Sequence, residues 1–484
     1  MRFNFRMILH ILGLLILING AFMLISLIVS IIFNDGAFVG FLISGCVSFA
    51  LGAVIWFATR KHEPTISKRE GFLVVTLGWL ALSLTGCLPY LFTGTLPVFA
   101  QAFFETVSGY TTTGSTVITD LTQVPESILF WRSLTQWIGG MGIIVLTIAI
   151  LPILGIGGME LFSAESPGPS AEKLHPRIKE AAKRLWLIYV SFTTLEAILL
   201  KLAGMDLFEA ICHSMATMST GGFSTQNESV AAYSPAIQYI ITFFMFMAGI
   251  NFTLTYFALN GKIRRVWKNE EFRSLLASIV VITILTTLGI MGSGGINTES
   301  SFRDALFQTV SIITTTGFVT ADYTSWTPFL TFLFFILMFV GASSGSTSGA
   351  MKQVRFIVVI KNGLLELKRQ LHPSAIIPVR FNQRAVGPKT TYNILAFFLL
   401  YITVFVIGGA VLSLFQGVDM LSAIGASAAS VGNIGPGIGK VGPTDNFAWI
   451  PDGGKVFLTA LMLIGRLELF TVLILFTPAF WRTI

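Results

Sequence analysis

Long apolar stretches separated by short polar loops dominate this chain. Ten of them have the length of roughly 20 residues that an α-helix needs to cross about 30 Å of hydrocarbon. They cover residues 7–33, 37–58, 71–92, 131–154, 183–203, 235–259, 273–292, 328–350, 392–416 and 454–479. The pattern predicts an all-α integral membrane protein with ten spanning helices. The first stretch is too long for a cleaved signal peptide and is expected to remain in the protein as a spanning helix.

Four shorter apolar segments lie between these stretches, at 102–110, 207–217, 305–313 and 419–430. Each is followed by a stretch rich in glycine and hydroxyl residues. The stretches end at Gly114, Gly222, Gly317 and Gly435, which are 108, 95 and 118 residues apart. The residue eight positions before each glycine is a small hydroxyl residue, namely Thr106, Ser214, Thr309 and Ser427. The segments are too short to span and too apolar for open loops, so each is expected to form a re-entrant half-helix.

This recurrence predicts four pseudo-symmetric repeats of helix, half-helix, glycine stretch and helix around a central pore. The expected parts are a two-helix N-terminal region at 1–67 and pore repeats at 68–170, 171–268, 269–385 and 386–484. The third repeat is expected to contain a broken second helix and an intramembrane loop. A secondary transporter for an organic solute is an alternative, but such proteins are typically built from two related halves rather than four quarters.

Composition and charge agree with a membrane protein. The chain is 54% hydrophobic and only 11% charged, with a mean hydropathy of +0.78. Basic residues cluster at alternate loops, and the opposite loops carry mainly Asp and Glu, so the positive-inside rule predicts cytoplasmic termini and glycine stretches that enter from the outer face. The net charge of +7 is therefore interpreted as a consequence of the basic cytoplasmic loops. Nucleic-acid binding is disfavoured because no compact soluble domain presents these charges.

The sequence does not favour an enzyme. The three cysteines, Cys46, Cys87 and Cys212, lie in apolar segments and suggest no disulfide framework, and no metal-ligand spacing occurs. We find no converging nucleophile or acid–base pair and no nucleotide-binding fingerprint, so no nucleotide or prosthetic group is expected in this chain. His213 is interpreted as a hydrogen-bonded residue of a buried half-helix.

The glycine stretches are the candidate ion site. A re-entrant backbone at membrane depth must be buried in protein or face water, and a half-helix directs the negative end of its dipole inward. Glycine allows successive carbonyl oxygens to replace the water around an ion, and uncharged oxygen ligands suit a monovalent cation. The candidate filter residues are Thr112, Thr113, Gly114, Thr220, Gly221, Gly222, Thr315, Thr316, Gly317, Asn433, Ile434 and Gly435. Close helix packing is the alternative for any single stretch. Glu105 is interpreted as a structural partner.

These features resemble the TrkH/TrkG/KtrB superfamily of potassium transporters, and its bacterial TrkH branch most. Further matching motifs are Trp137 through Gly142, the run from Leu151 through Gly158 with Pro167-Gly168-Pro169, Gly465 through Glu468, and Thr477 through Trp481. The resemblance implies potassium uptake across a bacterial inner membrane by a homodimer with a cytosolic, nucleotide-binding TrkA-like partner. Gly114 keeps the glycine associated with potassium selectivity. Gly432 replaces the first residue of the family's usual asparagine pair, which leaves the strictness of sodium exclusion open.

Two features are expected to gate the pore. The ten small residues from Gly341 to Ala350 interrupt the eighth span, and broken helices are tolerated at membrane depth where they border a cavity. Arg466 lies within the last span, where a charge must face protein or water, and in the family the matching arginine projects beneath the filter. The candidate gate residues are Gly341, Gly345, Ser346, Thr347, Gly349 and Arg466. A tight packing contact and a structural ion pair are the respective alternatives. Coupling of transport to sodium or protons also stays open.

Overall fold

A computed structural model describes residues 3–60, 67–142, 178–294, 297–372, 375 and 377–482. The regular elements of these residues are helical, apart from one antiparallel hairpin of β1 (Arg380–Phe381) and β2 (Arg384–Ala385). Asn382 and Gln383 turn the hairpin with positive φ angles of 48° and 64°, as a two-residue hairpin turn requires. The all-α class predicted from the apolar pattern is confirmed.

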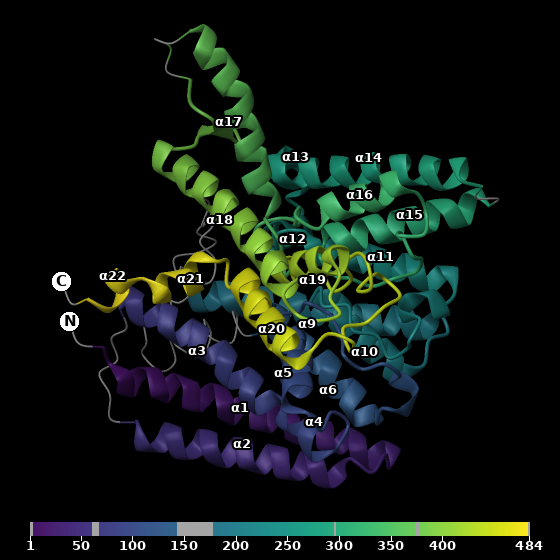
Figure 1. Cartoon of the computed structure of the whole chain (residues 1–484), viewed down its shortest axis with the longest axis vertical. Helices are drawn as coiled ribbons and strands as arrows, with labels where there is room; N and C mark the ends of the chain where they lie inside the picture. Colours follow the sequence, from purple (N-terminus) through teal and green to yellow (C-terminus); the bar gives the residue numbers. More distant parts are fainter. Residues whose placement is uncertain are drawn as a thin grey trace.

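The first two helices form an antiparallel pair along one side of the molecule (Figure 1). They are α1 (Phe5–Phe33) and α2 (Phe38–Ala58). Their glycines allow the backbones to approach closely: a Cβ atom at Gly20 would lie only 2.5 Å from the Phe49 nitrogen, and one at Gly13 only 2.8 Å from the Trp56 nitrogen. Small residues at the contact are the usual way in which membrane helices pack, since apolar burial does not drive helices together in lipid.

Four units of similar order follow this pair. The first contains α3 (Lys68–Gly86), α4 (Leu88–Phe92), α5 (Phe99–Tyr110), η1 (Leu121–Gln123), α6 (Glu126–Trp137) and the π-helical turn η2 (Ile138–Gly142). The second contains α9 (Ile178–Leu202), α10 (Leu207–Met218), η3 (Ser229–Ala232), α11 (Pro235–Gly249), α12 (Phe252–Leu259) and α13 (Ile263–Lys268). The third contains α14 (Glu270–Gly292), α15 (Thr298–Ile313), α16 (Pro328–Leu337) and α17 (Gln353–Leu371). The fourth contains α18 (Pro388–Leu412), α19 (Met420–Gly432), α20 (Asp452–Arg466), α21 (Phe470–Leu473), η4 (Ile474–Phe476) and α22 (Pro478–Trp481).

The expected half-helices are α5, α10, α15 and α19. Each follows the first long helix of its unit and packs against it, with α9 against α10 and α18 against α19 as clear cases. The third half-helix begins at Thr298, seven residues before the predicted start, because the Asn297 side chain accepts a hydrogen bond from the Glu299 amide and caps the helix there.

Six of the ten predicted spans are long, apolar helices, at Phe5–Phe33, Phe38–Ala58, Arg69–Phe92, Lys183–Leu202, Glu270–Gly292 and Pro388–Leu412. The prediction of a single helix was wrong for 235–259 and 454–479, since α11 and α12 meet at 106°, and α20 meets the helical segment Phe470–Phe476 at 111°. The eighth span is broken, as expected, after α16. The span at 131–154 lies partly outside the described residues. The run from Leu151 through Gly158 and the motif Pro167-Gly168-Pro169 lie entirely outside them.

The first bend has a tertiary cause. The Asn251 side chain accepts a hydrogen bond from the Thr253 amide and starts α12 afresh, and the Phe252 amide donates to the carbonyl of Gly345. The second bend falls at Glu468 and Leu469, whose φ angles are 56° and 51°. At the first bend, the Gly345 carbonyl of the segment between α16 and α17 thus replaces a helical acceptor. At the second bend the backbone bonds locally, with the Leu469 amide donating to the Ile464 carbonyl.

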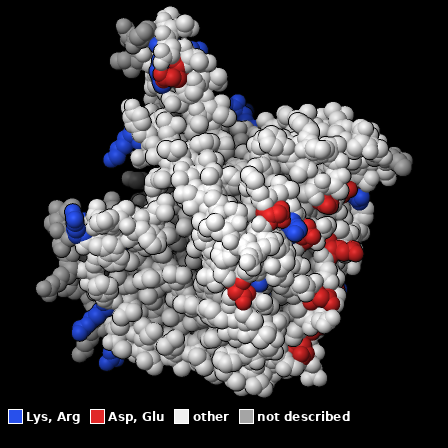
Figure 2. Space-filling model, viewed as in Figure 1, with Lys and Arg blue, Asp and Glu red and all other residues white. Residues whose placement is uncertain are grey.

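Charged residues separate along the molecule. Figure 2 shows most Lys and Arg side chains near the two termini and around α17, whereas most Asp and Glu side chains lie on the opposite side. The termini lie close together, and the ring centroids of Phe3 and Phe480 are 5.8 Å apart. This separation matches the alternation of basic and acidic loops in the sequence.

Candidate functional site

The four half-helices end in the same way. At the residue two positions before each glycine, φ is positive, with values of 52°, 55°, 57° and 51° at Thr112, Thr220, Thr315 and Asn433. The amide of this residue donates to the carbonyl three residues back, and the next amide donates to the carbonyl five residues back, in all four stretches. This is a Schellman-type ending, which glycine usually provides. A β-branched residue in this conformation is strained, and such strain concentrates at functional sites.

The four glycine stretches form a closed ring. A Cβ atom at Gly114 would collide with the carbonyl oxygen of Gly221 in the second stretch. A Cβ atom at Gly222 would likewise collide with the Thr316 oxygen, and one at Gly317 with the Ile434 oxygen. A Cβ atom at Gly435 would lie 2.9 Å from the Thr113 oxygen. The glycines have φ between 75° and 99°. Each quarter thus touches the next in sequence order, and the fourth touches the first.

The hydroxyl residues of the ring are buried. Thr111 and Thr113 share a hydrogen bond of 2.7 Å between their hydroxyls, and Thr314 and Thr316 share one of 2.8 Å. Within the described part of the chain, Thr112 Oγ1 and Asn433 Oδ1 are buried without a hydrogen-bond partner. Buried polar atoms normally find a partner, so these two oxygens can accept a donor or ligate a cation.

In three of the four quarters, a second contact holds the outer arm, the segment that follows the glycine, against its own half-helix. The residue nine positions before the glycine makes the contact in three quarters. Glu105 accepts from the Thr116 hydroxyl and the Val117 amide, His213 Nε2 lies 3.0 Å from the Ser224 hydroxyl, and Gln308 donates to the Ala321 carbonyl. Ala426 occupies this position in the fourth quarter. The structural roles expected for Glu105 and His213 are confirmed.

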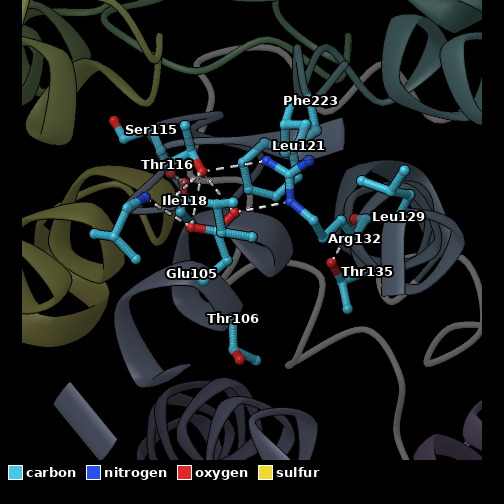
Figure 3. Close-up of polar contacts among 12 residues, drawn as sticks. Glu105, Thr106, Ser115, Thr116, Ile118, Leu121, Leu129, Arg132, Thr135 and Phe223 are labelled. Atoms are coloured by element: carbon cyan, nitrogen blue, oxygen red, sulfur yellow. Dashed lines mark hydrogen bonds and ion pairs between the residues drawn. The ribbon is translucent and has the colours of Figure 1, made fainter. Parts of the chain in front are cut away.

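Residues of α6 that were not predicted from the sequence also belong to the site. Figure 3 shows Arg132 facing Glu105, with Thr116 beside the pair and Phe223 over the guanidinium group. Gln136, one turn further along α6, contacts the backbone of the second glycine stretch. Arg132 is a charged residue inside a predicted span, so the rule that singled out Arg466 would also have found it.

The segment between α16 and α17 lies directly against the ring. The Gly349 amide donates to Thr315 Oγ1 at 2.6 Å, and the Ala350 amide donates to the Gly432 carbonyl at 2.9 Å. The Thr347 hydroxyl donates to the Met218 carbonyl at the end of the second half-helix. The predicted interruption of the eighth span therefore contacts the ends of at least three half-helices.

Two charged side chains hold this segment. Arg466 donates to the carbonyl of Thr347 at 2.8 Å and to the carbonyls of Gly139 and Gly140 at 3.0 and 3.1 Å. Glu271 of α14 accepts from the amides of Ser344 and Val354, at 2.7 and 3.2 Å. Glu271 was missed because it lies in a mainly basic loop and its partners are distant in sequence. Glu468 forms an ion pair with Arg355, in agreement with the expectation that it is not the direct partner of Arg466.

The loops that follow the first two glycine stretches are linked through Asp120. Asn227 donates to Asp120 Oδ1 at 3.0 Å, and its own side-chain oxygen accepts from the Leu121 amide at 2.7 Å. Hydrogen bonds from Asn227 and Thr122 lower the pKa of Asp120 to about 2. Because the pKa is lowered on folding, this link is fully present at neutral pH and is lost only as the pH falls toward 2.

The structure brings all twelve predicted filter residues into one ring and places the predicted gate segment beside it. Gly341 donates its amide to the Met351 carbonyl, Gly345 packs against Asn251, and Ser346 donates to the Ser343 carbonyl. Arg466 lies at the end of α20, at the bend, rather than in the middle of a straight helix.

Comparison with known proteins agrees with this architecture. The family described as TrkH, cation transport protein, matches residues 39–483. The Trk system potassium uptake protein TrkH of Escherichia coli K12 is 41% identical over 484 residues, which cover 99% of this chain and 100% of that protein. The TrkG protein of the same strain is 33% identical over 483 residues, which cover 99% of each chain.

A solved structure supports the same relationship. The crystal structure of the potassium transporter TrkH from Vibrio parahaemolyticus has a TM-score of 0.89 and 40% sequence identity, covering 99% of this chain and 100% of that one. The sequence and fold agree over nearly the whole length. The chain therefore belongs to the TrkH family of cation transport proteins.

Proposed function

We propose that this chain carries potassium ions across a bacterial inner membrane through the ring of glycine stretches. One observation carries the proposal: each of the four glycines lies against a main-chain carbonyl oxygen of the next quarter, and the four contacts form a closed ring. A ring of main-chain oxygens can replace the water around a weakly hydrated cation, and four half-helix ends add negative potential. The relatives named potassium uptake proteins support potassium as the transported ion.

The proposed ligands are the carbonyl oxygens of the twelve filter residues, with Thr112 Oγ1 and Asn433 Oδ1 at the start of the stretches. Potassium is the transported substrate here, not a resident cofactor. The charge separation in Figure 2 supports termini on the cytoplasmic side, since basic residues stay inside. The acidic outer side then raises the local concentration of cations before they enter.

The gate in this proposal is the segment from Gly341 to Ala350 together with Arg466. Its hydrogen bonds to Thr315 and Gly432 support a position at the inner end of the ring, where Arg466 would add a positive charge. We infer that conduction requires this segment to move. A TrkA-like nucleotide-binding protein on the cytosolic side would supply the driving interaction.

The homodimer expected from the family has a candidate surface on α17. Ile360, Leu364, Leu367 and Leu371 lie one helical turn apart along α17 and are 59% to 77% exposed. Spacings of four, three and four residues form an apolar stripe that suits pairing with a second helix. Figure 1 shows α17 projecting from the rest of the molecule, so a second copy can reach it.

Rubidium uptake into liposomes that contain the purified chain tests the function. We expect uptake that excess potassium blocks more strongly than excess sodium. Equal competition would reject potassium selectivity, and folded protein without flux would reject a self-sufficient pore. Uptake that requires an imposed sodium or proton gradient would favour the alternative of a coupled potassium symporter.

A further inference from the structure

The helix that follows the first glycine stretch holds the backbone of the second one. Gln136 of α6 donates from Nε2 to the Gly221 carbonyl at 2.7 Å, and its Oε1 accepts from the Phe223 amide at 3.1 Å. One turn earlier, Arg132 donates to the Ser224 carbonyl at 3.1 Å, and its guanidinium carbon lies 4.1 Å from the centre of the Phe223 ring. The α6 side chains thus bind the second stretch at Gly221, Phe223 and Ser224.

The same helix is tied to the first stretch by a buried ion pair. Arg132 Nε lies 2.8 Å from Glu105 Oε1, with the side chains only 2% and 0% exposed. The Glu105 carboxylate also accepts from the Thr116 hydroxyl at 2.9 and 3.1 Å and from the Val117 amide at 2.9 Å (Figure 3). A buried carboxylate with this many donors has a fixed orientation. We call Glu105, Arg132, Gln136 and Phe223 the seam between the first and second quarters.

Because of the seam, the four carbonyls of the ring do not have the same hydrogen bonds. The carbonyls that abut the glycines belong to Thr113, Gly221, Thr316 and Ile434. Among the described residues, the Gly221 carbonyl is the one of these four that accepts a hydrogen bond from a side chain. A Cβ atom at Gly221 would collide with Gln136 Cδ, so a larger residue there would displace the Gln136 side chain. The third and fourth quarters are joined by the Tyr323 hydroxyl, which donates to the Gly437 carbonyl. The fourth and first are joined within the ring by Asn433 Nδ2, which donates to Thr113 Oγ1 at 2.9 Å.

We propose that Gln136 and Arg132 are positioning residues that set the ion selectivity of the filter. The inference rests on the proposed function and adds residues outside the glycine stretches to it. In a filter that selects by cavity size, carbonyls that do not move inward leave the smaller sodium ion poorly coordinated. The hydrogen bond from Gln136 tethers the Gly221 carbonyl, and the Arg132–Glu105 pair fixes the arm beyond it. Without this hydrogen bond the Gly221 carbonyl can move inward and coordinate a sodium ion.

Substitution of Gln136 by leucine tests the tether. Leucine has a similar volume and cannot hydrogen-bond, so the carbonyl is released without opening a large cavity. We expect the preference for potassium over sodium as competitors of rubidium uptake to fall about three- to tenfold, the range that one or two hydrogen bonds can supply. Arg132→Lys keeps the charge beside Glu105 but loses the planar fork, and should reduce the preference less.

The control is Gln370→Leu, which removes an exposed glutamine that donates to Glu366 on α17. It should leave the preference unchanged. Thermal unfolding in detergent is measured for every variant. An unaltered preference in folded Gln136→Leu would overturn the seam inference alone, whereas a wild-type protein that does not discriminate would overturn the proposed selectivity. Failure of both seam variants to fold would also overturn it, since the seam would then maintain the fold rather than ion choice.

Discussion

Single residues decide the shape of the ring. A Cβ atom at Gly114, Gly222 or Gly317 would collide with a carbonyl of the next quarter, while at Gly435 the nearest atom would be 2.9 Å away. We therefore expect Gly114→Ser to raise sodium uptake relative to potassium, because the added side chain pushes the Gly221 carbonyl from its place. Gly435→Ser should have a smaller effect. Competition by sodium and potassium for rubidium uptake measures both variants.

Two controls accompany this comparison. Gly94→Ser and Gly204→Ser place a side chain at glycines that also have positive φ but have open space around them. They share the backbone strain and lack the collision with a ring carbonyl. If all four variants change ion preference equally, or if Gly114→Ser leaves it unchanged, the assignment of the filter is wrong.

At the scale of elements, the segment between α16 and α17 is held from two sides. Arg466→Ala removes the positive charge and the hydrogen bonds to Thr347, Gly139 and Gly140. Glu271→Ala removes the acceptor for the Ser344 and Val354 amides. Both should raise basal rubidium flux several-fold, since a loop with fewer anchors opens more often. Flux without any regulatory partner measures this.

Arg466→Lys separates the two contributions of the arginine. Lysine keeps the charge but cannot reach three carbonyls with a planar group. If Arg466→Lys has basal flux near the wild-type level, the positive charge is what limits conduction. If its flux is near that of Arg466→Ala, the hydrogen bonds that hold the loop are what limit it. A loop that only fills space predicts a lower unfolding temperature with unchanged flux in Arg466→Ala and Glu271→Ala, and that result would contradict the gate.

For the whole molecule, the exposed stripe on α17 predicts the oligomeric state. Leu364→Lys and Leu367→Lys place charges in the centre of the stripe, where a second copy would have to bury them. We expect the double variant to shift the purified protein from dimer to monomer while the pore of each chain keeps its ion preference. Light scattering and native mass spectrometry measure the mass.

The matched control for this shift lies on another exposed apolar face. Ile284→Lys and Leu288→Lys on α14 introduce the same two charges at positions that are 52% and 62% exposed. An equal loss of dimer in this control would indicate a general effect on detergent binding. A dimer that persists in the α17 variant would show that the stripe contacts lipid instead.

Much of the architecture follows from the sequence because its causes are local. Membrane-length apolar runs specify the long helices, and the recurring glycine stretches specify the half-helices and their common endings, since the capping hydrogen bonds join residues three to five positions apart. The repeat also predicted which residues lie at the contacts of the ring. The spacing alone revealed that four equivalent segments exist.

The tertiary structure decided how these segments meet. Gln136 is 85 residues from Gly221, and Glu271 is 73 residues from Ser344, so no local pattern marks either contact. The bend after Gly249 is held by a hydrogen bond from the Phe252 amide to the Gly345 carbonyl of the loop between α16 and α17, although hydropathy alone predicts a straight span there. Apolar patterning fixes which residues enter the membrane, and only the folded chain determines which polar groups become partners once they are inside it.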